Sequence, residues 1–317
     1  MQQTNETELT YFVIKGISDD PHLQLPIFIL VFFIYVVTLG GNLTILLLVI
    51  IDIKLHTPMY FFLANLSIMD ISSATVTQHK ILAIYLTKNR TISYLDCMTR
   101  VYFYSSVTAS ELLMLSVMSY DRYLAICKPL HYSASASIIS CVFLTFACWI
   151  LGFLQVIPYI ILLSNISCYR SNLINHFFCD LTSVMKLSCS NIQALEILIL
   201  TEGLLMLNLT PCLLTFIPYA FIIISILKIK SISGKQKAFY TCSSHLTVVV
   251  ILYFSLGCQY LKPVSKDSQM SDKLLSFLNS TVVPLLNPLI YSLRNRDVKA
   301  ASVKIIKCFF RSDFSRA

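Results

Sequence analysis

The segment MSYDRYLAIC, residues 118–127, ends the third of seven long apolar stretches and puts a charged pair, Asp121 and Arg122, at the end of that stretch. A helix needs about 20 apolar residues to cross a bilayer, and only helices and closed barrels satisfy their backbone hydrogen bonds in lipid. We therefore expect seven transmembrane helices, at about 25–50, 58–86, 98–126, 138–163, 197–227, 237–260 and 273–292. Charges are costly at such positions, so the pair is a candidate functional site.

The composition favours a membrane protein and argues against a soluble one. The chain is 56% hydrophobic and only 13% charged, with a mean hydropathy of +0.73. Such values fall outside the range of ordinary soluble domains. The fold class we predict is an all-α membrane protein with a seven-transmembrane helix bundle. Its parts would be an outer tail at 1–24, the bundle at 25–292 and an inner tail at 293–317, with no room for a second domain.

The basic residues set the expected orientation, because cytoplasmic loops of membrane proteins are enriched in Lys and Arg. One side of the predicted bundle gathers Lys54, Lys128, Lys228, Lys230, Lys235, Lys237, Arg294, Arg296, Lys299, Lys304, Lys307, Arg311 and Arg316. On the other side, basic residues are balanced by acids. The first side is predicted to be cytoplasmic, with the N-terminus outside. Most of the net charge of +8 then suits anionic membrane lipid and an acidic protein partner, and no nucleic acid is expected as a partner.

The inner tail resumes a helical pattern after Arg294. Apolar residues alternate with lysines there, which predicts a short amphipathic cytoplasmic helix on the inner leaflet after the seventh span. Cys308 in this helix is either palmitoylated or an unmodified cytosolic cysteine.

The outer side holds candidates for covalent modification. Asn5 begins an Asn-Glu-Thr sequon in the outer tail and is the best glycosylation site. Of the eleven cysteines, Cys97, Cys168, Cys179 and Cys189 are expected to face outside, where four free thiols are much less favourable than disulfides. Four cysteines allow three pairings. Cys97 with Cys179 would pin the second outer loop over the bundle, and Cys168 with Cys189 would close that loop on itself.

The third span carries a polar stripe. Tyr104, Thr108, Glu111, Leu115 and Arg122 share one helical face, which we expect to point into the bundle. Glu111 lies at a depth comparable to that of an acid in the second span, and two neighbouring carboxyls in a membrane should not both be ionised and unpaired.

That second acid is Asp70. Our hypothesis is that Asp70 and Glu111 share a proton, a water cluster or a sodium ion with Asn42 and Asn287. A static hydrogen-bonded network that only fixes helix packing is an equally acceptable interpretation.

Several motifs together resemble vertebrate olfactory receptors, a branch of the rhodopsin-like G-protein-coupled receptors. Besides MSYDRYLAIC, they are Gly41-Asn42, LHTPMYFFL at 55–63, LSIMD at 66–70, KPLHY at 128–132, KAFYTCSSHL at 237–246 and PLLNPLIYSLRN at 284–295. Each motif alone is weak, but their joint order and spacing across nearly the whole chain are specific. The resemblance implies an odorant receptor that activates a stimulatory heterotrimeric G protein and raises cyclic AMP.

The resemblance also implies roles for residues near the inner face. Arg122 is expected to leave Asp121 on activation and to contact the G protein α subunit. The residues implied to take part in coupling and activation are Asp121, Arg122, Tyr123, Tyr219, His245, Asn287, Pro288 and Tyr291. The chain departs from the family pattern at Pro218, before Tyr219, and at Tyr240. Pro218 removes a backbone donor and can kink its helix. Because both changes lie near the predicted cytoplasmic face, we expect them to affect coupling efficiency more than ligand binding.

The ligand is expected in the outer half of the bundle, since helical bundles bind small molecules between their helices. The predicted lining is Tyr104, Ser105, Thr108, Ala109, Leu112, Gly203, Leu207, Tyr253, Leu256, Gly257, Tyr260, Phe277 and Ser280. None of these is charged, so a small, largely apolar and neutral compound fits best. Any one of the aromatic residues is also explained by core packing alone.

Other classes of protein fit less well. The sequence lacks the mid-span lysine of a retinal-type pump, the repeat symmetry of a transporter and the nucleophile or paired metal ligands of an intramembrane enzyme. We expect no cofactor and no catalytic residue. The segment His176–Asp180 has metal-ligand residue types, but a disulfide at Cys179 would spoil such a site, so no metal is predicted. The alternative function is a receptor of the same fold that senses an endogenous metabolite outside olfactory tissue.

Overall fold

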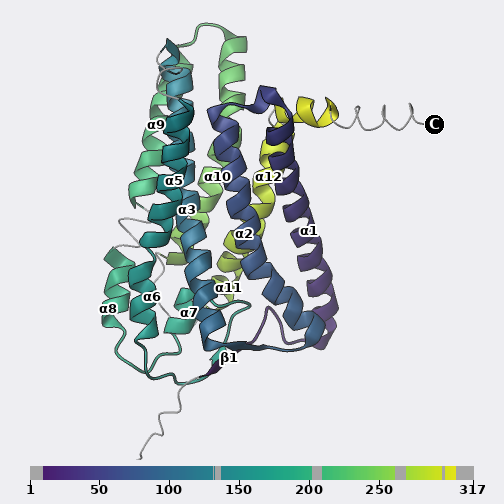
Figure 1. Cartoon of the computed structure of the whole chain (residues 1–317), viewed down its shortest axis with the longest axis vertical. Helices are drawn as coiled ribbons and strands as arrows, with labels where there is room; N and C mark the ends of the chain where they lie inside the picture. The colour runs from purple at the N-terminus through teal and green to yellow at the C-terminus, as the bar shows by residue number, and fades with distance from the viewer. Residues whose placement is uncertain are drawn as a thin grey trace, which may run out of the picture.

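The structure is a computed structural model that describes residues 10–130, 132, 137–201, 209–260, 269–294 and 297–304. Long helices running up and down the molecule form one bundle (Figure 1). Among the described residues, six helical segments are long and apolar enough to cross a membrane, and a shorter apolar stretch, His245–Cys258, lies within a seventh helix. The predicted membrane helix bundle is therefore confirmed at this level.

The helices fall into long spans and short connecting pieces. The long ones are α1 (Pro21–Ile51), α2 (Pro58–Thr87), α3 (Tyr94–Cys127), α5 (Ile138–Leu154), α9 (Thr210–Lys228), α10 (Ile232–Tyr260) and α12 (Val283–Arg294). The short ones are η1 (Ile53–Leu55), α6 (Ile157–Ser164), α7 (Leu181–Met185), α8 (Gln193–Leu198), α11 (Gln269–Phe277) and the π-helical turn η4 (Leu278–Val282). Residues 297–304 form a further helix, which leaves the bundle sideways in Figure 1.

Local sequence signals explain where the long helices begin and end. The Asp20 carboxylate caps α1 by accepting a hydrogen bond from the His22 amide, and the Ser93 hydroxyl caps α3 through the Asp96 amide. Pro58 occupies the first turn of α2, where its missing N–H costs nothing. The left-handed backbone of Lys88, with φ of 58°, ends that helix.

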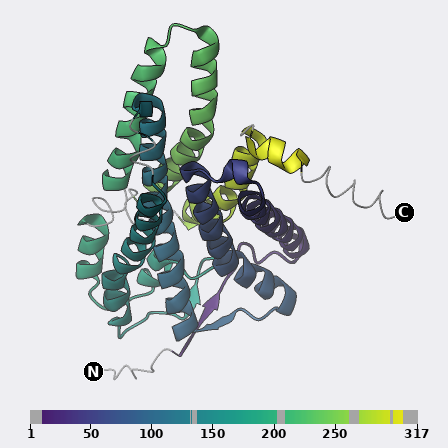
Figure 2. The same cartoon turned by 45° about the horizontal axis from the view of Figure 1, so that its top comes forward.

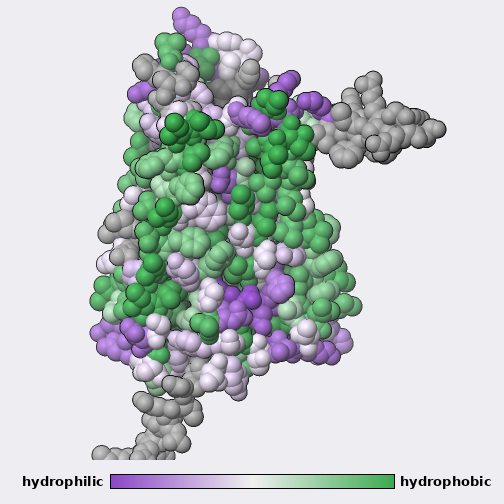
Figure 3. Space-filling view, in the orientation of Figure 1, coloured by the Kyte–Doolittle hydropathy of each residue, from purple (hydrophilic) through white to green (hydrophobic). Residues whose placement is uncertain are grey.

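The third long helix, α3, is the centre of the bundle. In its most apolar 18-residue window 67% of the residues are buried, against 22% in α1 and 28% in the span formed by α5 and α6. Large apolar side chains stay exposed on the outer helices, for example Phe33 and Phe143, and hydrophobic surface covers much of the visible face (Figure 3). A bundle with an apolar exterior around a more polar central helix is what a lipid environment requires.

Three predicted spans are less regular than expected. The span at 138–163 is divided into α5 and α6 around Gln155 and Val156, where Pro158 enters the first turn of α6. The span at 197–227 is described only as the end of α8 and as α9, because residues 202–208 lie outside the described part. The span at 273–292 combines α11, η4 and α12.

A small sheet also corrects the all-α expectation. Strand β1 (Tyr11–Ile14) pairs antiparallel with β2 (Thr91–Ser93) and parallel with β3 (Leu173–Ile174). Phe12 and Ile14 point inward and are fully buried. Figure 2 shows β1 crossing the end of the bundle near the N-terminus. Alternation of buried and exposed residues over four positions is too short a signal to separate this strand from a loop.

Disulfides tie the same end of the molecule together. Cys97, in the first turn of α3, is bonded to Cys179 with a Cα–Cα distance of 5.5 Å. Cys168 is bonded to Cys189, 5.3 Å away between Cα atoms, within one loop. The sheet, the two disulfides and the buried Phe12 together form a cover at this end of the bundle.

Candidate functional site

The predicted ligand residues that the structure describes lie on the inward faces of α3, α10 and the last span. Tyr104, Ala109, Leu112, Tyr253, Leu256 and Ser280 are buried, whereas Ser105, Thr108, Gly257 and Phe277 are partly buried. Gly203 and Leu207 lie outside the described residues, and so does the side chain of Tyr260.

Two aromatic residues from the covering loop reach this site. Phe178 meets the Tyr104 ring edge-on at 5.2 Å between centroids, and Phe177 meets Phe277 at 6.1 Å. Both loop residues are at least 97% buried, at 1% and 3% exposure. Sequence analysis missed their contact with the site, although their position next to Cys179 was a signal, since a disulfide to α3 brings the preceding residues over the bundle.

A chain of hydroxyl groups lies deeper, between three helices. The Ser116 and Thr215 hydroxyls are 2.9 Å apart, and Thr215 is 3.2 Å from the Tyr253 hydroxyl. Ser116 also lies within hydrogen-bonding distance of the Pro211 carbonyl oxygen, at 3.1 Å. This chain links α3, α9 and α10 and ends at Tyr253, one of the predicted ligand residues. Only Tyr253 was predicted as a site residue, because contacts between helices leave no periodic signal in a single helix.

The predicted polar core is assembled around Asp70. The Asn287 side-chain amide donates to both carboxylate oxygens of Asp70, at 2.9 and 3.0 Å. Glu111 is close enough to act on Asp70 electrostatically, and its Oε1 atom is buried with no hydrogen-bond partner among the described residues. Asn42 instead donates to the Thr38 and Pro284 carbonyls, at 3.0 and 3.2 Å. Asn42 therefore ties α1 to the last span.

Gln78 is a further polar group that sequence analysis missed. Its side chain is fully buried, and both of its amide heteroatoms lack a partner within the described part of the chain. It shares a face of α2 with Asp70, Ala74 and Thr77, at helical spacing. That spacing was the signal that could have found it. Buried unpartnered polar atoms of this kind are typical of places that hold water, an ion or a polar ligand group.

Near the C-terminal end of α3, the Asp121 carboxylate has two hydrogen-bond partners. It accepts a 2.8 Å hydrogen bond from the Arg122 guanidinium and a 2.9 Å bond from the Tyr132 hydroxyl. Burial, followed by the adjacent Asp121 charge, raises the pKa of the Tyr132 phenol well above its usual value. Arg122 is therefore held by its own neighbour, and Tyr123 packs beside it against Phe221 at 5.9 Å.

Three of the residues predicted to take part in coupling, Tyr219, His245 and Tyr291, lie within electrostatic reach of Arg122. Tyr219 on α9 is hydrogen-bonded through its hydroxyl to Nδ1 of His245 on α10, and both side chains are buried. The Tyr291 hydroxyl is buried with no hydrogen-bond partner in the described segments. Pro288 lies so close to Gly41 that a Cβ atom built on Gly41 falls 2.9 Å from the proline Cβ.

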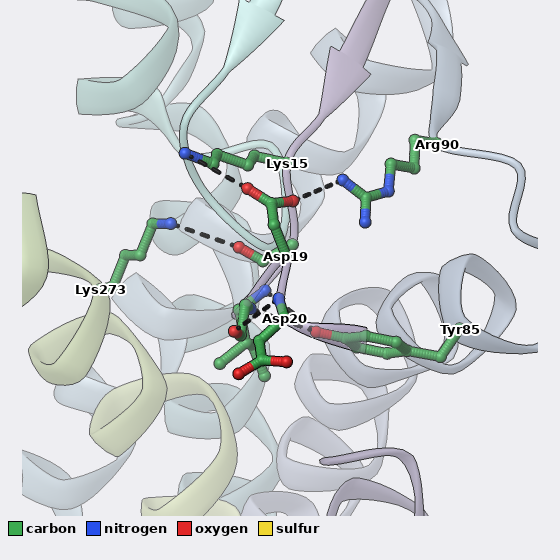
Figure 4. A network of polar contacts seen from close by, with 9 residues as sticks. Lys15, Asp19, Asp20, Tyr85, Arg90 and Lys273 are labelled. Atoms are coloured by element: carbon green, nitrogen blue, oxygen red, sulfur yellow. Dashed lines mark hydrogen bonds and ion pairs between the residues drawn. The ribbon is translucent and has the colours of Figure 1, made fainter. Parts of the chain in front are cut away.

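The covering end of the bundle is also tied by charges (Figure 4). Asp19 lies 2.6 Å from the Arg90 guanidinium and 3.3 Å from the Lys15 ammonium group. The hydrogen bond from Arg90 is the main reason that the pKa of Asp19 falls below its usual value. Lys273 at the start of the last span donates to the Gly16 carbonyl at 3.3 Å, which fastens the segment after β1 to that span.

His176, on the same cover, is almost fully buried. Burial lowers the pKa of its imidazole to about 4, and its Nε2 atom has no partner among the described residues. No group of three or more His, Cys, Asp or Glu side chains among the described residues is arranged to hold a metal ion. The buried neutral ring stacks on Phe177, at 4.4 Å between centroids, so it serves the packing of the aromatic cover.

Comparisons with known proteins decide the family. A family model described as olfactory receptor matches residues 31–308. The chain belongs to the olfactory receptor family. Mouse olfactory receptor 8G17 is 44% identical over 307 residues, covering 97% of this chain and 100% of that protein. Human olfactory receptors 8D1 and 6C3 are 43% and 42% identical, over 96% and 95% of this chain and 99% and 97% of their own lengths.

The family membership settles the class of protein. This olfactory receptor is an odorant receptor of the G-protein-coupled type and a multi-pass protein of the plasma membrane, rather than an enzyme.

Proposed function

We propose that this receptor binds a small, mostly apolar, neutral odorant between α3, α10 and the last span, beneath Phe177 and Phe178. The observation that carries the proposal is the character of the described site residues. They are aromatic, aliphatic or hydroxyl-bearing, and none of the predicted ligand residues carries a charge. A neutral aromatic site of this kind favours apolar ligands, and its few hydroxyls would fix their orientation.

The size of an odorant limits its affinity. About 12 heavy atoms at roughly 0.3 to 0.5 kcal/mol each supply about 4 to 6 kcal/mol, which corresponds to dissociation constants from about millimolar to tens of micromolar. The ligand activates only by binding the active state better than the inactive one, so this energy also caps the shift in population.

For coupling, we propose that Arg122 leaves Asp121 and contacts a G protein of the stimulatory class, which raises cyclic AMP. Arginine suits this role because its guanidinium stays charged and presents several donors in a fixed geometry. Tyr123, Tyr219, His245, Asn287, Pro288 and Tyr291 would rearrange around it. The present contacts, Arg122 with Asp121 and Tyr219 with His245, are those expected of an inactive state.

We also propose that the core of Asp70, Glu111, Asn42 and Asn287 is a switch that takes up a proton, water or a sodium ion. Support comes from the unpartnered Glu111 oxygen close to a carboxylate that already accepts two hydrogen bonds. Signalling should then depend on sodium concentration or on pH. Indifference to both would leave only the static network.

The topology proposed for this chain places the N-terminus outside, with Asn5 glycosylated. Its parts are the outer tail 1–24, the bundle 25–292 and the inner tail 293–317 with an amphipathic cytoplasmic helix. In the described part of that tail, residues 297–304 are helical, and Val298 and Ala301 are buried. Asn5, Ile306, Lys307, Cys308 and Phe309 lie outside the described residues.

The decisive experiment is an odorant panel read out by cyclic AMP in cells that express the receptor. Arg122→Ala should abolish the response to every agonist, and surface expression should stay measurable by antibody. Tyr104→Ala should weaken the response to some agonists, whereas Tyr104→Phe, which keeps the ring and its contact with Phe178, should preserve most of it. A full response in the Arg122→Ala cells would refute the coupling role.

The alternative function is detection of an endogenous metabolite outside olfactory tissue by the same site. The same panel extended to neutral metabolites, together with the tissue of expression, separates the two functions. A response confined to a metabolite would favour the alternative.

A further inference from the structure

A group of charged side chains interrupts the apolar exterior of the bundle where α2 and α3 lie side by side. Figure 3 shows hydrophilic surface over the lower part of this face, with hydrophobic surface above it and at its sides and more polar surface below it. The charged residues of this region are Lys80 on α2 and Asp96 and Arg100 on α3. Exposed leucines, Leu86 at 73% and Leu95 at 74%, flank them. Charged residues in membrane spans usually face the bundle interior, so a charged group at the exterior needs a specific explanation.

The three side chains form one cluster. Arg100 Nε donates to the Asp96 carboxylate at 2.9 Å, and its Nη1 donates to the Val76 carbonyl on α2 at 2.9 Å. Lys80 Nζ donates to the Thr91 carbonyl of β2 at 2.8 Å and lies within electrostatic reach of Arg100 and Asp96. These hydrogen bonds of Arg100 use its Nε and Nη1 atoms, and that of Lys80 uses one of three ammonium donors. The cluster therefore keeps donors free on both cations.

The charges of the cluster do not cancel. Lys80 and Arg100 contribute two positive charges and Asp96 one negative charge. One positive charge therefore remains on the lipid-facing exterior of the bundle. An unneutralised charge in hydrocarbon costs about 2.5 to 3.5 kcal/mol on insertion scales, and less near the interface. A single anionic group would balance this cluster.

The depth of the cluster identifies the anion. With 30 residues in α2 and 34 in α3, these helices are about 45 and 51 Å long, so each extends about 8 to 10 Å beyond a 30 Å hydrocarbon core at either end. Lys80 lies seven residues before the end of α2 and Arg100 six residues after the start of α3, about 10 and 9 Å along the axes. Both Cα atoms thus lie near the boundary between hydrocarbon and headgroups, from which the long Lys and Arg side chains can extend toward the lipid phosphates.

We propose that Lys80 and Arg100 bind the phosphodiester of a membrane phospholipid in the seam between α2 and α3. The Arg100 fork and the Lys80 ammonium group supply the donors, and the net positive charge of the cluster matches the single negative charge of a phosphodiester. The bound lipid ties α2 to α3 beside Cys97 and β2. This binding site is separate from the odorant site and does not depend on which ligand the receptor detects.

The test uses purified, delipidated receptor in detergent, with binding followed by native mass spectrometry and by the midpoint of thermal unfolding. Three probes are compared: dioleoyl phosphatidylcholine, dioleoylglycerol with the same chains but no phosphate, and inorganic phosphate. We expect the phospholipid alone to remain bound and to raise the midpoint. Lys80→Gln and Arg100→Gln should each weaken retention of the phospholipid about fivefold. Asp96→Asn should strengthen it.

The matched control is Lys88→Gln, which removes an exposed cation from the loop next to α2 and should leave retention of the phospholipid unchanged. If Arg100→Gln fails to fold, Arg100→Lys keeps the positive charge but lacks the planar guanidinium with its paired donors. Its retention of the phospholipid should fall below that of the wild type. Equal retention of dioleoylglycerol, or unchanged phospholipid retention in both cation variants, would overturn the proposal. Equal stabilisation by inorganic phosphate would show an adventitious ion only.

Discussion

The contact between α3 and α5 offers a sharp test of the packing, because it depends on the absence of one side-chain atom. A Cβ atom built on Gly152 falls 2.0 Å from the Ser110 hydroxyl, 2.8 Å from the Ser110 amide nitrogen and 2.9 Å from the Ser106 carbonyl oxygen. Rotation of Ser110 can relieve only the first of these contacts. In Gly152→Ala the two helices must therefore separate by about 0.6 Å to restore an ordinary contact of 3.4 Å with backbone atoms.

The cost follows from two opposing effects. Alanine gains about 0.8 to 1.0 kcal/mol over glycine in helix propensity, whereas overpacking against a backbone costs about 1 to 3 kcal/mol or more. We expect Gly152→Ala to lose about 2 kcal/mol of unfolding free energy, which lowers the thermal midpoint of the purified receptor by about 4 °C. The separation would also shift Ser106 and Ser110, each two residues, or about half a turn, from Thr108, so odorant potency should fall as well.

The same molecule contains matched controls for this substitution. No atom lies within 4 Å of a Cβ built on Gly40, so Gly40→Ala should be neutral or slightly stabilising. Gly41→Ala, which meets only Pro288 side-chain atoms at 2.9 and 3.0 Å, should fall between the two. The reasoning is refuted if Gly152→Ala has a midpoint equal to or above that of Gly40→Ala, or if Ser110→Gly combined with Gly152→Ala restores full stability.

Three further outcomes are expected. Phe178→Ala should raise the half-maximal concentration of agonists by removing the ring that meets Tyr104, while Phe178→Tyr should keep most of the potency in a cyclic AMP dose–response assay; equal curves for wild type and alanine variant would exclude the contact. The pKa of His176 falls from about 6.5 in the unfolded chain to about 4 in the receptor, so stability is complete above pH 6.5 and is lost as the pH falls toward 4, by up to about 3 kcal/mol. Thermal midpoints measured from pH 7.5 to 4.5 should show this decline, and His176→Asn, which cannot titrate, should flatten it. Breaking the Asp121–Tyr132 hydrogen bond with Tyr132→Phe should raise ligand-independent cyclic AMP, because Asp121 then holds Arg122 in a less ordered geometry; basal signalling at the wild-type level would count against a restraining role.

The sequence was sufficient to predict features that lie along single helices. The apolar stretches predicted the long spans, because the length of an apolar run is read directly from consecutive residues. The inward stripe of α3 also followed from helical spacing alone. Its residues Tyr104, Glu111 and Leu115 are all buried in the bundle.

Contacts between distant segments could not be predicted in the same way. Ser116 and Thr215 are ordinary hydroxyl residues in their own helices, and only the packing of α3 on α9 makes them neighbours of Tyr253. Strand β1 is defined by its partners at 91–93 and 173–174, which are far away in the chain. Irregularities such as the π-helical turn η4 depend on packing too, since its sequence LNSTV is compatible with an ordinary helix.

The interactions that hold the two ends of the bundle together differ in strength, and this difference predicts where the receptor can move. The cover is held by two disulfides, three paired strands and fully buried Phe12 and Ile14, and separating it from the bundle would expose side chains each worth about 1.5 to 3 kcal/mol. At the opposite end, separate segments are joined by hydrogen bonds such as Tyr132 to Asp121 and Tyr219 to His245, each worth about 0.5 to 3 kcal/mol net, beside a small apolar cluster that includes Ile222 and Ile226. An odorant that supplies about 4 to 6 kcal/mol can offset the loss of two such bonds, but not the loss of the cover as well. Activation should therefore open the inner end while the cover stays in place. Distances measured to a fixed reference label should change with agonist for a spin label at exposed Ile232 and stay constant for one at exposed Tyr11.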